Sequence, residues 1–163
     1  MSIIYPPKVL NRIRKTDAGL DVGMGKSKWA INLYSEGYNI QGFDLYAGSD
    51  RGPFRKADIN DLTDSSYSNL DYIFSTWSIF TYRESRSFQQ KSLAKMAAWL
   101  KIGGKIYLAP VNPAAIEKLL VDIPTLQMTD RGEGAYHYVE LTKKPATQTI
   151  EPAVIQQIFY MSY

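Results

Sequence analysis

Short apolar runs alternate with helix-like stretches along most of this 163-residue chain. Apolar runs bounded by turn-forming residues predict strands at 18–22, 38–44, 54–59, 71–75 and 105–109. Apolar residues at helical spacing predict helices at 26–36 and 85–100, and an Asn-Pro pair at 112–113 opens a third helix. Strands that alternate with helices predict a parallel sheet covered by crossover helices, which is an α/β fold.

The end of the chain follows a different pattern. Residues 125–129 and 136–142 are predicted to be strands, and the segment DRGEG between them is typical of a hairpin. A hairpin joins antiparallel strands, so the last of seven strands is expected to run against the others. We therefore expect one domain over 1–144 and a tail over 145–163. Apolar residues of the tail fall one helical turn apart. We therefore expect the tail either to dock on the domain or to pair with another chain in a homo- or hetero-oligomer.

Composition and charge exclude several classes of protein. The chain has no cysteine, which excludes disulfides, thiolate metal sites and a cysteine nucleophile, and we expect no metal centre. No window approaches the roughly 18 consecutive apolar residues of a membrane span, and the N-terminal stretch lacks the apolar core of a signal peptide. We therefore expect a cytoplasmic protein without membrane contact. The net charge of +3 favours an ordinary surface, so nucleic acid is only a weakly supported partner.

The glycine-rich stretch GLDVGMGKSKW follows the first predicted strand and is a candidate for nucleotide binding. It does not fit a phosphate-binding P-loop, because that motif needs a glycine where Leu20 stands. It does not fit the dinucleotide fingerprint, because Lys28 replaces the third glycine. Asp44 ends the second predicted strand, and its carboxylate can accept hydrogen bonds from both hydroxyls of a ribose. These features suit an adenosine-containing ligand without choosing among cofactors.

Five segments in order, LDVGMGKS, GFDL, KADIND, LDYIFSTWSIF and LKIGGKIYLA, resemble the motif series of the class I S-adenosylmethionine-dependent methyltransferases. The resemblance covers residues 17–144 and rests on the order and spacing of the segments, since no single one is specific. It implies a three-layer, Rossmann-like methyltransferase fold with a mostly parallel seven-stranded sheet and an antiparallel last strand. It also implies S-adenosylmethionine as the cofactor. Ser27 departs mildly from the family, which often has glycine or another small residue there.

The resemblance implies cofactor-binding roles for residues of the first two strands. Gly23 and Gly25 would let the backbone lie against the methionine and ribose portions of the cofactor. Asp44 would bind the ribose hydroxyls, unless it is structural only. Asp21 would hold the glycine loop and take the cofactor's ammonium through water, although it could serve only to hydrogen-bond the loop.

Residues from other segments would complete the cofactor site by the same resemblance. Phe43 and Leu45 would flank the adenine ring. Asp58 would accept from the adenine amino group with Ile59 beside the ring, unless Asp58 is an ordinary turn aspartate. Ser75 would offer its backbone carbonyl to the cofactor's ammonium.

The segment STWSIFTYRE, after the fourth predicted strand, is where the family usually places its reacting groups. Trp77, Phe80 and Tyr82 are predicted to wall the cleft, and Trp77 is also a predicted cofactor-binding residue because an aromatic face favours the cationic sulfonium. Trp77 and Phe80 could instead pack on the neighbouring helix. Tyr82 and Glu84 are the candidate catalytic bases. The only histidine, His137, falls in a predicted strand and fits a packed or surface residue better than a general base.

Missing motifs narrow the range of possible methyl acceptors. No Asp/Asn-Pro-Pro-Tyr follows the fourth strand, and the Lys-Asp-Lys-Glu set of RNA ribose methyltransferases is absent. These absences leave a small molecule or a protein side chain as the expected acceptor of the methyltransferase. In-line transfer of an activated methyl depends mainly on alignment, so a strong catalytic signature is not required. A basic loop at 48–56, with Lys26 and Lys28, would instead suit an acidic substrate or nucleic acid. Two alternatives remain: a non-catalytic cofactor-binding or assembly module, and an enzyme that uses the cofactor's aminopropyl or carboxypropyl arm.

Overall fold

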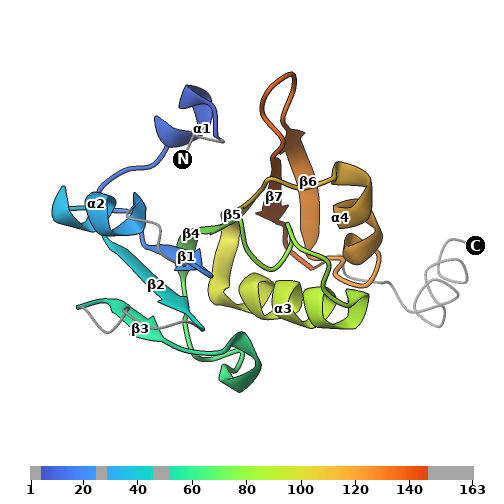
Figure 1. Ribbon diagram of the computed structural model, residues 1–163, viewed down its shortest axis with the longest axis horizontal. Helices are drawn as coiled ribbons and strands as arrows, with labels where there is room; N and C mark the ends of the chain where they lie inside the picture. The colour runs from blue at the N-terminus through green and yellow to red at the C-terminus, as the bar shows by residue number, and fades with distance from the viewer. Residues whose placement is uncertain (1–4, 25–28, 46–51, 147–163) are drawn as a thin grey trace, which may run out of the picture.

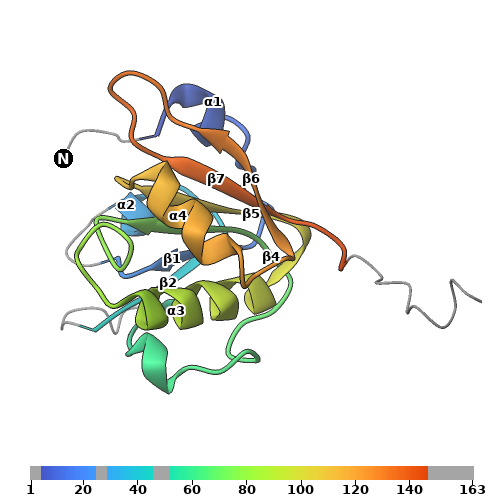
Figure 2. The same cartoon turned by 90° about the vertical axis from the view of Figure 1, so that its right-hand side faces the viewer.

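The computed structural model describes residues 5–24, 29–45 and 52–146. Seven strands form one sheet in the order β3-β2-β1-β4-β5-β7-β6 (Figures 1 and 2). The strands are β1 (Gly19–Val22), β2 (Ile40–Asp44), β3 (Phe54–Lys56), β4 (Leu70–Thr76), β5 (Leu100–Ala109), β6 (Leu126–Arg131) and β7 (Val139–Lys143). Strands β1 to β5 pair in parallel, whereas β7 is antiparallel to both β5 and β6. The predicted mostly parallel sheet with an antiparallel last strand is therefore confirmed.

Helices cover both faces of the sheet and give the molecule three layers (Figure 2). The helices are α1 (Pro7–Leu10), α2 (Trp29–Ser35), α3 (Arg86–Trp99) and α4 (Pro113–Leu120). Leu93 of α3 and Ile116 of α4 belong to a core on one face, whereas α1 and α2 cover a second core that contains Phe74. Within the described residues, no helix is both long and apolar enough to cross a membrane.

The helices begin and end at signals that are visible in the sequence. Ser85 Oγ accepts from the Phe88 N–H at 3.1 Å at the start of α3. Asn112 Oδ1 accepts from the Ala114 N–H at 3.0 Å at the start of α4. Gly37 follows α2 with φ 94°, a conformation that glycine adopts without strain. The main helices therefore lie where the sequence predicts them.

Strand β3 is shorter than predicted, and the reason lies in the turn that follows. The strand ends at Lys56, and the chain then enters a 3-10 turn, η1 (Ile59–Asp61). Asp58 caps this turn, because its Oδ1 accepts from the Asn60 N–H at 2.9 Å. The turn brings Asp58 and Ile59 to the carboxyl end of the sheet instead of extending the strand.

Strand β5 is longer than predicted, since it begins directly after α3. Leu100 already pairs with Leu70 of β4, and the regular pairing resumes at Lys105 with Tyr72. The intervening residues include Gly103, with φ 84°, which permits the irregularity. The segment 101–104, which precedes the strand predicted at 105–109, is therefore a local distortion within β5.

The N-terminal segment docks beside the β6–β7 hairpin through α1, a helix that no pattern in the sequence predicts (Figure 2). Lys8 Nζ forms an ion pair with Asp130 Oδ2 at 2.7 Å. Arg12 Nη2 forms another with Glu140 Oε1 of β7 at 2.5 Å. These two contacts tie the beginning of the chain to its last two strands.

Candidate functional site

A pocket of about 510 Å³ lies at the carboxyl ends of β1, β2, β3 and β4. This is the size of a small-molecule site. The strand order reverses here, because β2 and β3 lie on one side of β1 and β4 lies on the other. Ligands of open α/β sheets bind at such a reversal. The described residues that line the pocket are Gly23, Phe43, Asp44, Leu45, Ala57, Asp58, Ile59, Trp77, Ser78, Ile79, Tyr82, Glu84 and Phe88.

The turn after β1 is bare because Gly23 has no side chain. Gly23 has φ 69°, and its N–H donates to the Phe43 carbonyl at 3.0 Å. A Cβ at this position would overlap Ser78 Oγ and approach Ser78 Cβ to 2.8 Å. Glycine therefore meets both a conformational and a steric requirement at the floor of the pocket.

Two aspartates lie on neighbouring strands at this end of the pocket. Asp44 ends β2, is 7% exposed and lines the pocket, whereas Asp21 of β1 is 3% exposed and is not among the lining residues. Burial, followed by the negative charge of Asp44, raises the pKa of Asp21 to about 7. A cation bound near Asp21 would stabilise the ionised form of its carboxyl group. The arrangement therefore suits a positively charged ligand.

Residues of β2 and of the turn after β3 form an apolar wall. Phe43 and Ile59 are buried, and Leu45 is 48% exposed at the mouth. Asp58 faces the same pocket while its Oδ1 caps the turn through Asn60. Asp58 therefore has the turn role that the sequence left open, and its adenine-binding role stays a prediction.

Trp77 lines the pocket from the segment after β4. Its φ is 50°, which is rare for a bulky residue, and its side chain is 46% exposed. The Trp77 N–H donates to the Ala109 carbonyl at 2.8 Å and so continues the β4–β5 pairing. Backbone strain of this kind gathers at functional sites. The structure places Trp77 at the pocket rather than in the core beneath α3.

The other residues predicted around this segment separate into two groups. Tyr82 and Glu84, the candidate bases, are exposed and line the pocket. Phe80 is not a lining residue and is buried in the core with Leu93 of α3, so its predicted place in the cleft wall is corrected to the packing alternative. Ser75 is buried within β4 and does not line the pocket, and its Oγ has no hydrogen-bond partner among the described residues.

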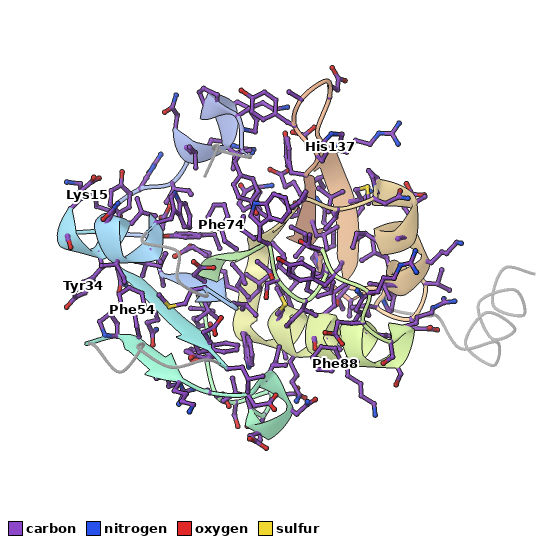
Figure 3. The ribbon with its side chains drawn as sticks, viewed as in Figure 1. Lys15, Tyr34, Phe54, Phe74, Phe88 and His137 are labelled. Carbon is purple, nitrogen blue, oxygen red and sulfur yellow. The ribbon has the colours of Figure 1, made fainter. Side chains whose placement is uncertain are left out.

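Four lining residues were missed by sequence reasoning. Ser78 and Ile79 follow Trp77 in a segment that already carried predictions, and Ala57 precedes Asp58. Their positions next to predicted residues were the available signal. Phe88 lies in the first turn of α3, where it contributes both to the pocket and to the core (Figure 3). No pattern in the sequence distinguishes it from an ordinary core residue.

Some predictions are corrected and others fall outside the described residues. His137 is exposed and precedes β7, because the pairing of β7 with β6 begins at Val139. Figure 3 shows His137 on the hairpin, well away from Phe88. Gly25, Lys26, Lys28, part of the 48–56 loop and most of the tail lie outside the described residues. In the part of the chain that the structure describes, no cluster of histidine and acidic side chains could hold a metal ion.

Comparison with known proteins identifies the fold. No family model matches this chain, and no curated protein matches it by sequence. Solved structures do match. The sugar N-methyltransferase KedS8 from Streptoalloteichus has a TM-score of 0.67 at 12% identity over 85% of each chain. The 1,6-didemethyltoxoflavin-N1-methyltransferase of Burkholderia thailandensis has a TM-score of 0.62 at 14% identity over 85% of this chain and 74% of that one. Its structure contains bound 1,6-didemethyltoxoflavin and S-adenosylhomocysteine.

A third structure extends the same result. Magnesium protoporphyrin IX methyltransferase from Synechocystis, solved with S-adenosylmethionine, has a TM-score of 0.55 at 16% identity over 78% of this chain and 70% of that one. The low identities limit the likeness to the fold. This chain therefore has the class I S-adenosylmethionine-dependent methyltransferase fold that its motif series implies.

Proposed function

We propose that this protein is an S-adenosylmethionine-dependent methyltransferase whose acceptor is a small molecule or a protein side chain. One observation carries the proposal: the pocket at the strand-order reversal has a bare turn at Gly23 and a carboxylate, Asp44, at the end of β2. Structures of the same fold include a sugar N-methyltransferase and 1,6-didemethyltoxoflavin-N1-methyltransferase, which supports the general class of activity.

The residues present fit this cofactor on their chemistry. A carboxylate such as Asp44 can accept from both ribose hydroxyls. Phe43 and Ile59 offer apolar surface to a flat adenine ring, with Asp58 at its edge. The acidic end of the pocket also suits the positive charges of the sulfonium and the amino group, because Asp44 lines it and Asp21 lies on the neighbouring strand β1. Gly23 leaves the space that a side chain would fill.

When bound, S-adenosylmethionine supplies a methyl group already activated on a positively charged sulfur. Holding an acceptor in line with such a group contributes on the order of 7–11 kcal/mol to catalysis. The chain's own residues therefore need to bind and orient the acceptor more than to exchange protons with it. Trp77 and Tyr82 would flank the acceptor, and the Glu84 carboxylate would accept a hydrogen bond from it.

Thermal melting with four ligands tests the proposal. At a concentration about 100 times the dissociation constant, a ligand adds roughly 2.7 kcal/mol to stability, which is about 5–10 °C for a chain of this size. We expect this shift with S-adenosylmethionine and S-adenosylhomocysteine and almost none with NAD or ATP. Asp44→Ala should remove most of the shift, whereas Asp64→Ala, at an exposed position outside the pocket, should preserve it.

The outcomes separate the alternatives. No shift with either adenosyl ligand would overturn the proposal. A full shift without turnover on any acceptor would favour a non-catalytic binding or assembly module. Mass spectrometry of the products would reveal use of the aminopropyl or carboxypropyl arm, because the sulfur product would then keep its methyl group.

A further inference from the structure

The pocket has two ends that come from different parts of the chain. The cofactor end follows β1, β2 and β3 and holds the residues assigned to S-adenosylmethionine in the proposed function, on which this inference rests. The acceptor end comes from the segment after β4 and from α3, and consists of Trp77, Ser78, Ile79, Tyr82, Glu84 and Phe88. The chemistry of the acceptor end therefore bears on what is methylated.

The charged side chains among the described lining residues of the pocket are all acidic. Asp44, Asp58 and Glu84 line it, and no lysine, arginine or histidine is among the described lining residues. Arg83 and Arg86 are near Glu84 in the sequence but do not line the pocket, and Arg86 Nη2 donates to a backbone carbonyl of α4 at 3.0 Å. An anionic acceptor would meet like charges here, whereas a cationic one would be attracted.

The acceptor end also offers aromatic surface. The side chains of Trp77 and Tyr82 are 46% and 59% exposed. Trp77 is held at φ 50°, yet that strained conformation does not bury its indole in the core. Aromatic faces attract cations, and they do so more strongly when water is displaced. A nearby carboxylate adds its own attraction for the cation. Exposed aromatic rings together with Glu84 are the chemistry of a site for an organic cation.

We infer that the acceptor is an amine, a primary or secondary amino group that is protonated in solution and is carried on an apolar or planar group. The carrier would stack on Trp77 and Tyr82, and an N–H of the amino group would donate to the Glu84 carboxylate. A hydroxyl acceptor would gain less than an ammonium from the Glu84 carboxylate, and a carboxylate acceptor would be repelled by it.

The transfer balances in atoms and charge. The acceptor ammonium first loses a proton to water, which reaches the pocket mouth because Tyr82 and Glu84 are exposed. The nitrogen lone pair then forms the new bond to the methyl carbon, and the carbon–sulfur bond breaks with its electron pair on sulfur. The positive charge moves from sulfur to nitrogen, so the carboxylates of the pocket face one cation before and after the step. S-adenosylhomocysteine leaves as a neutral thioether at the reacting sulfur.

Three probes of matched shape test the inference: phenethylamine, 2-phenylethanol and 3-phenylpropanoate. Their affinities are measured by calorimetry with and without S-adenosylhomocysteine. We expect the amine to bind at least about tenfold more tightly than the alcohol, a difference of roughly 1.4 kcal/mol, and the carboxylate to bind most weakly. Equal binding of the three, tighter binding of the carboxylate, or no binding of the amine overturns the inference.

Two glutamate variants show whether the preference comes from the pocket. Glu84→Gln should bring the amine close to the alcohol in affinity while S-adenosylhomocysteine binding persists. Glu117→Gln, the same change at an exposed position of α4 outside the pocket, should keep the wild-type preference. An unchanged preference in Glu84→Gln contradicts the role of Glu84. If the wild type fails to bind S-adenosylhomocysteine, the proposed function falls, whereas the amine preference of the pocket is still measured by the probes.

Discussion

Two acids, Asp21 in β1 and Glu140 in β7, are equally buried but lie in opposite electrostatic surroundings. Each is 3% exposed. Burial and the charge of Asp44 both raise the pKa of Asp21. Burial acts in the same direction on Glu140, but hydrogen bonds from Thr129 and Arg12 and the charge of Lys105 lower its pKa overall. Equal burial therefore produces opposite ionisation behaviour because the neighbours differ.

The surroundings of Glu140 belong to the fold. Thr129 Oγ1 donates to Glu140 Oε2 at 2.7 Å, and Lys105 Nζ lies 3.5 Å from the same oxygen. Arg12 completes the set and ties the N-terminal segment to β7. A buried carboxylate with several donors can remain ionised without a ligand. Glu140 is therefore a structural acid, complete in the isolated chain.

The surroundings of Asp21 differ from those of Glu140. Those around Asp21 oppose its negative charge in the isolated chain, and it stands beside a pocket that a cation would suit. Titratable groups with raised or lowered pKa values gather at functional sites because a ligand completes their surroundings. The comparison separates an acid whose neighbours favour its negative charge from an acid whose neighbours oppose it. The next three predictions test that separation, from the largest expected effect to the smallest.

Gly23→Ala should do the most damage, because the new methyl group would overlap Ser78 in a left-handed turn. The expected loss of stability is on the order of 2–5 kcal/mol from the strained backbone and the overlap together. The shift in melting temperature with S-adenosylmethionine should also disappear. Urea unfolding and thermal melting measure the two effects.

Gly134→Ala is the matched control for this change. Gly134 has φ 61°, but a Cβ there would meet nothing within 4 Å. The Gly134→Ala variant should therefore lose only the stability that the strained backbone costs, about 1–2 kcal/mol, and keep the shift in melting temperature with S-adenosylmethionine. Equal losses of stability and unimpaired ligand binding in both variants would show that the bare turn is not required.

Asp21→Asn should change how stability depends on pH. The folded pKa of about 7 lies above the unfolded value of 3.8, so the stability linked to the bound proton is present below about pH 4 and is lost as the pH rises through 7. The asparagine variant cannot titrate. The free energy of unfolding of the wild type should therefore fall relative to that of the variant between pH 4 and 8, by on the order of 2–4 kcal/mol in urea unfolding.

Asp64→Asn, at an exposed position, serves as the control and should follow the wild-type pH curve. S-adenosylmethionine should reduce the wild-type loss at high pH, because a cation near Asp21 favours its ionised form. Parallel curves for wild type and Asp21→Asn would mean that burial does not raise this pKa in solution.

Arg12→Met should have the smallest effect of the three. It removes one donor from Glu140 while Thr129 and Lys105 remain, so we expect a loss of about 1–3 kcal/mol in urea unfolding. The shift with S-adenosylmethionine should be unchanged, because Arg12 lies outside the pocket. A lost ligand shift with unchanged stability would reverse the roles that we assign to the two acids.

Much of the fold was predictable because the signals are local. Apolar runs, Gly37 and the caps at Ser85 and Asn112 mark the main elements. The helix α1 was not predictable, since its place depends on Lys8 and Arg12 meeting acids far along the chain. Contacts of that kind form only in three dimensions and leave no spacing in the sequence.

The site was predictable at its strand ends and less so elsewhere. Parallel strands bring their carboxyl ends to one edge, which agrees with the motif series through which the sequence grouped Gly23, Asp44 and Trp77. The burial of Phe80 and the inward position of Phe88 depend on how α3 packs against the sheet. Sequence order carries no information about that packing.

The exposure of Trp77 has a practical consequence for optical work on this protein. The chain has three tryptophans, and they occupy three environments: Trp99 is fully buried, Trp29 is partly buried and Trp77 is open to solvent. Emission from an indole at the pocket mouth is expected to change when a molecule covers it, whereas the indole of Trp99 is closed to solvent. The intrinsic fluorescence of Trp77 can therefore report ligand binding at the pocket without an attached dye.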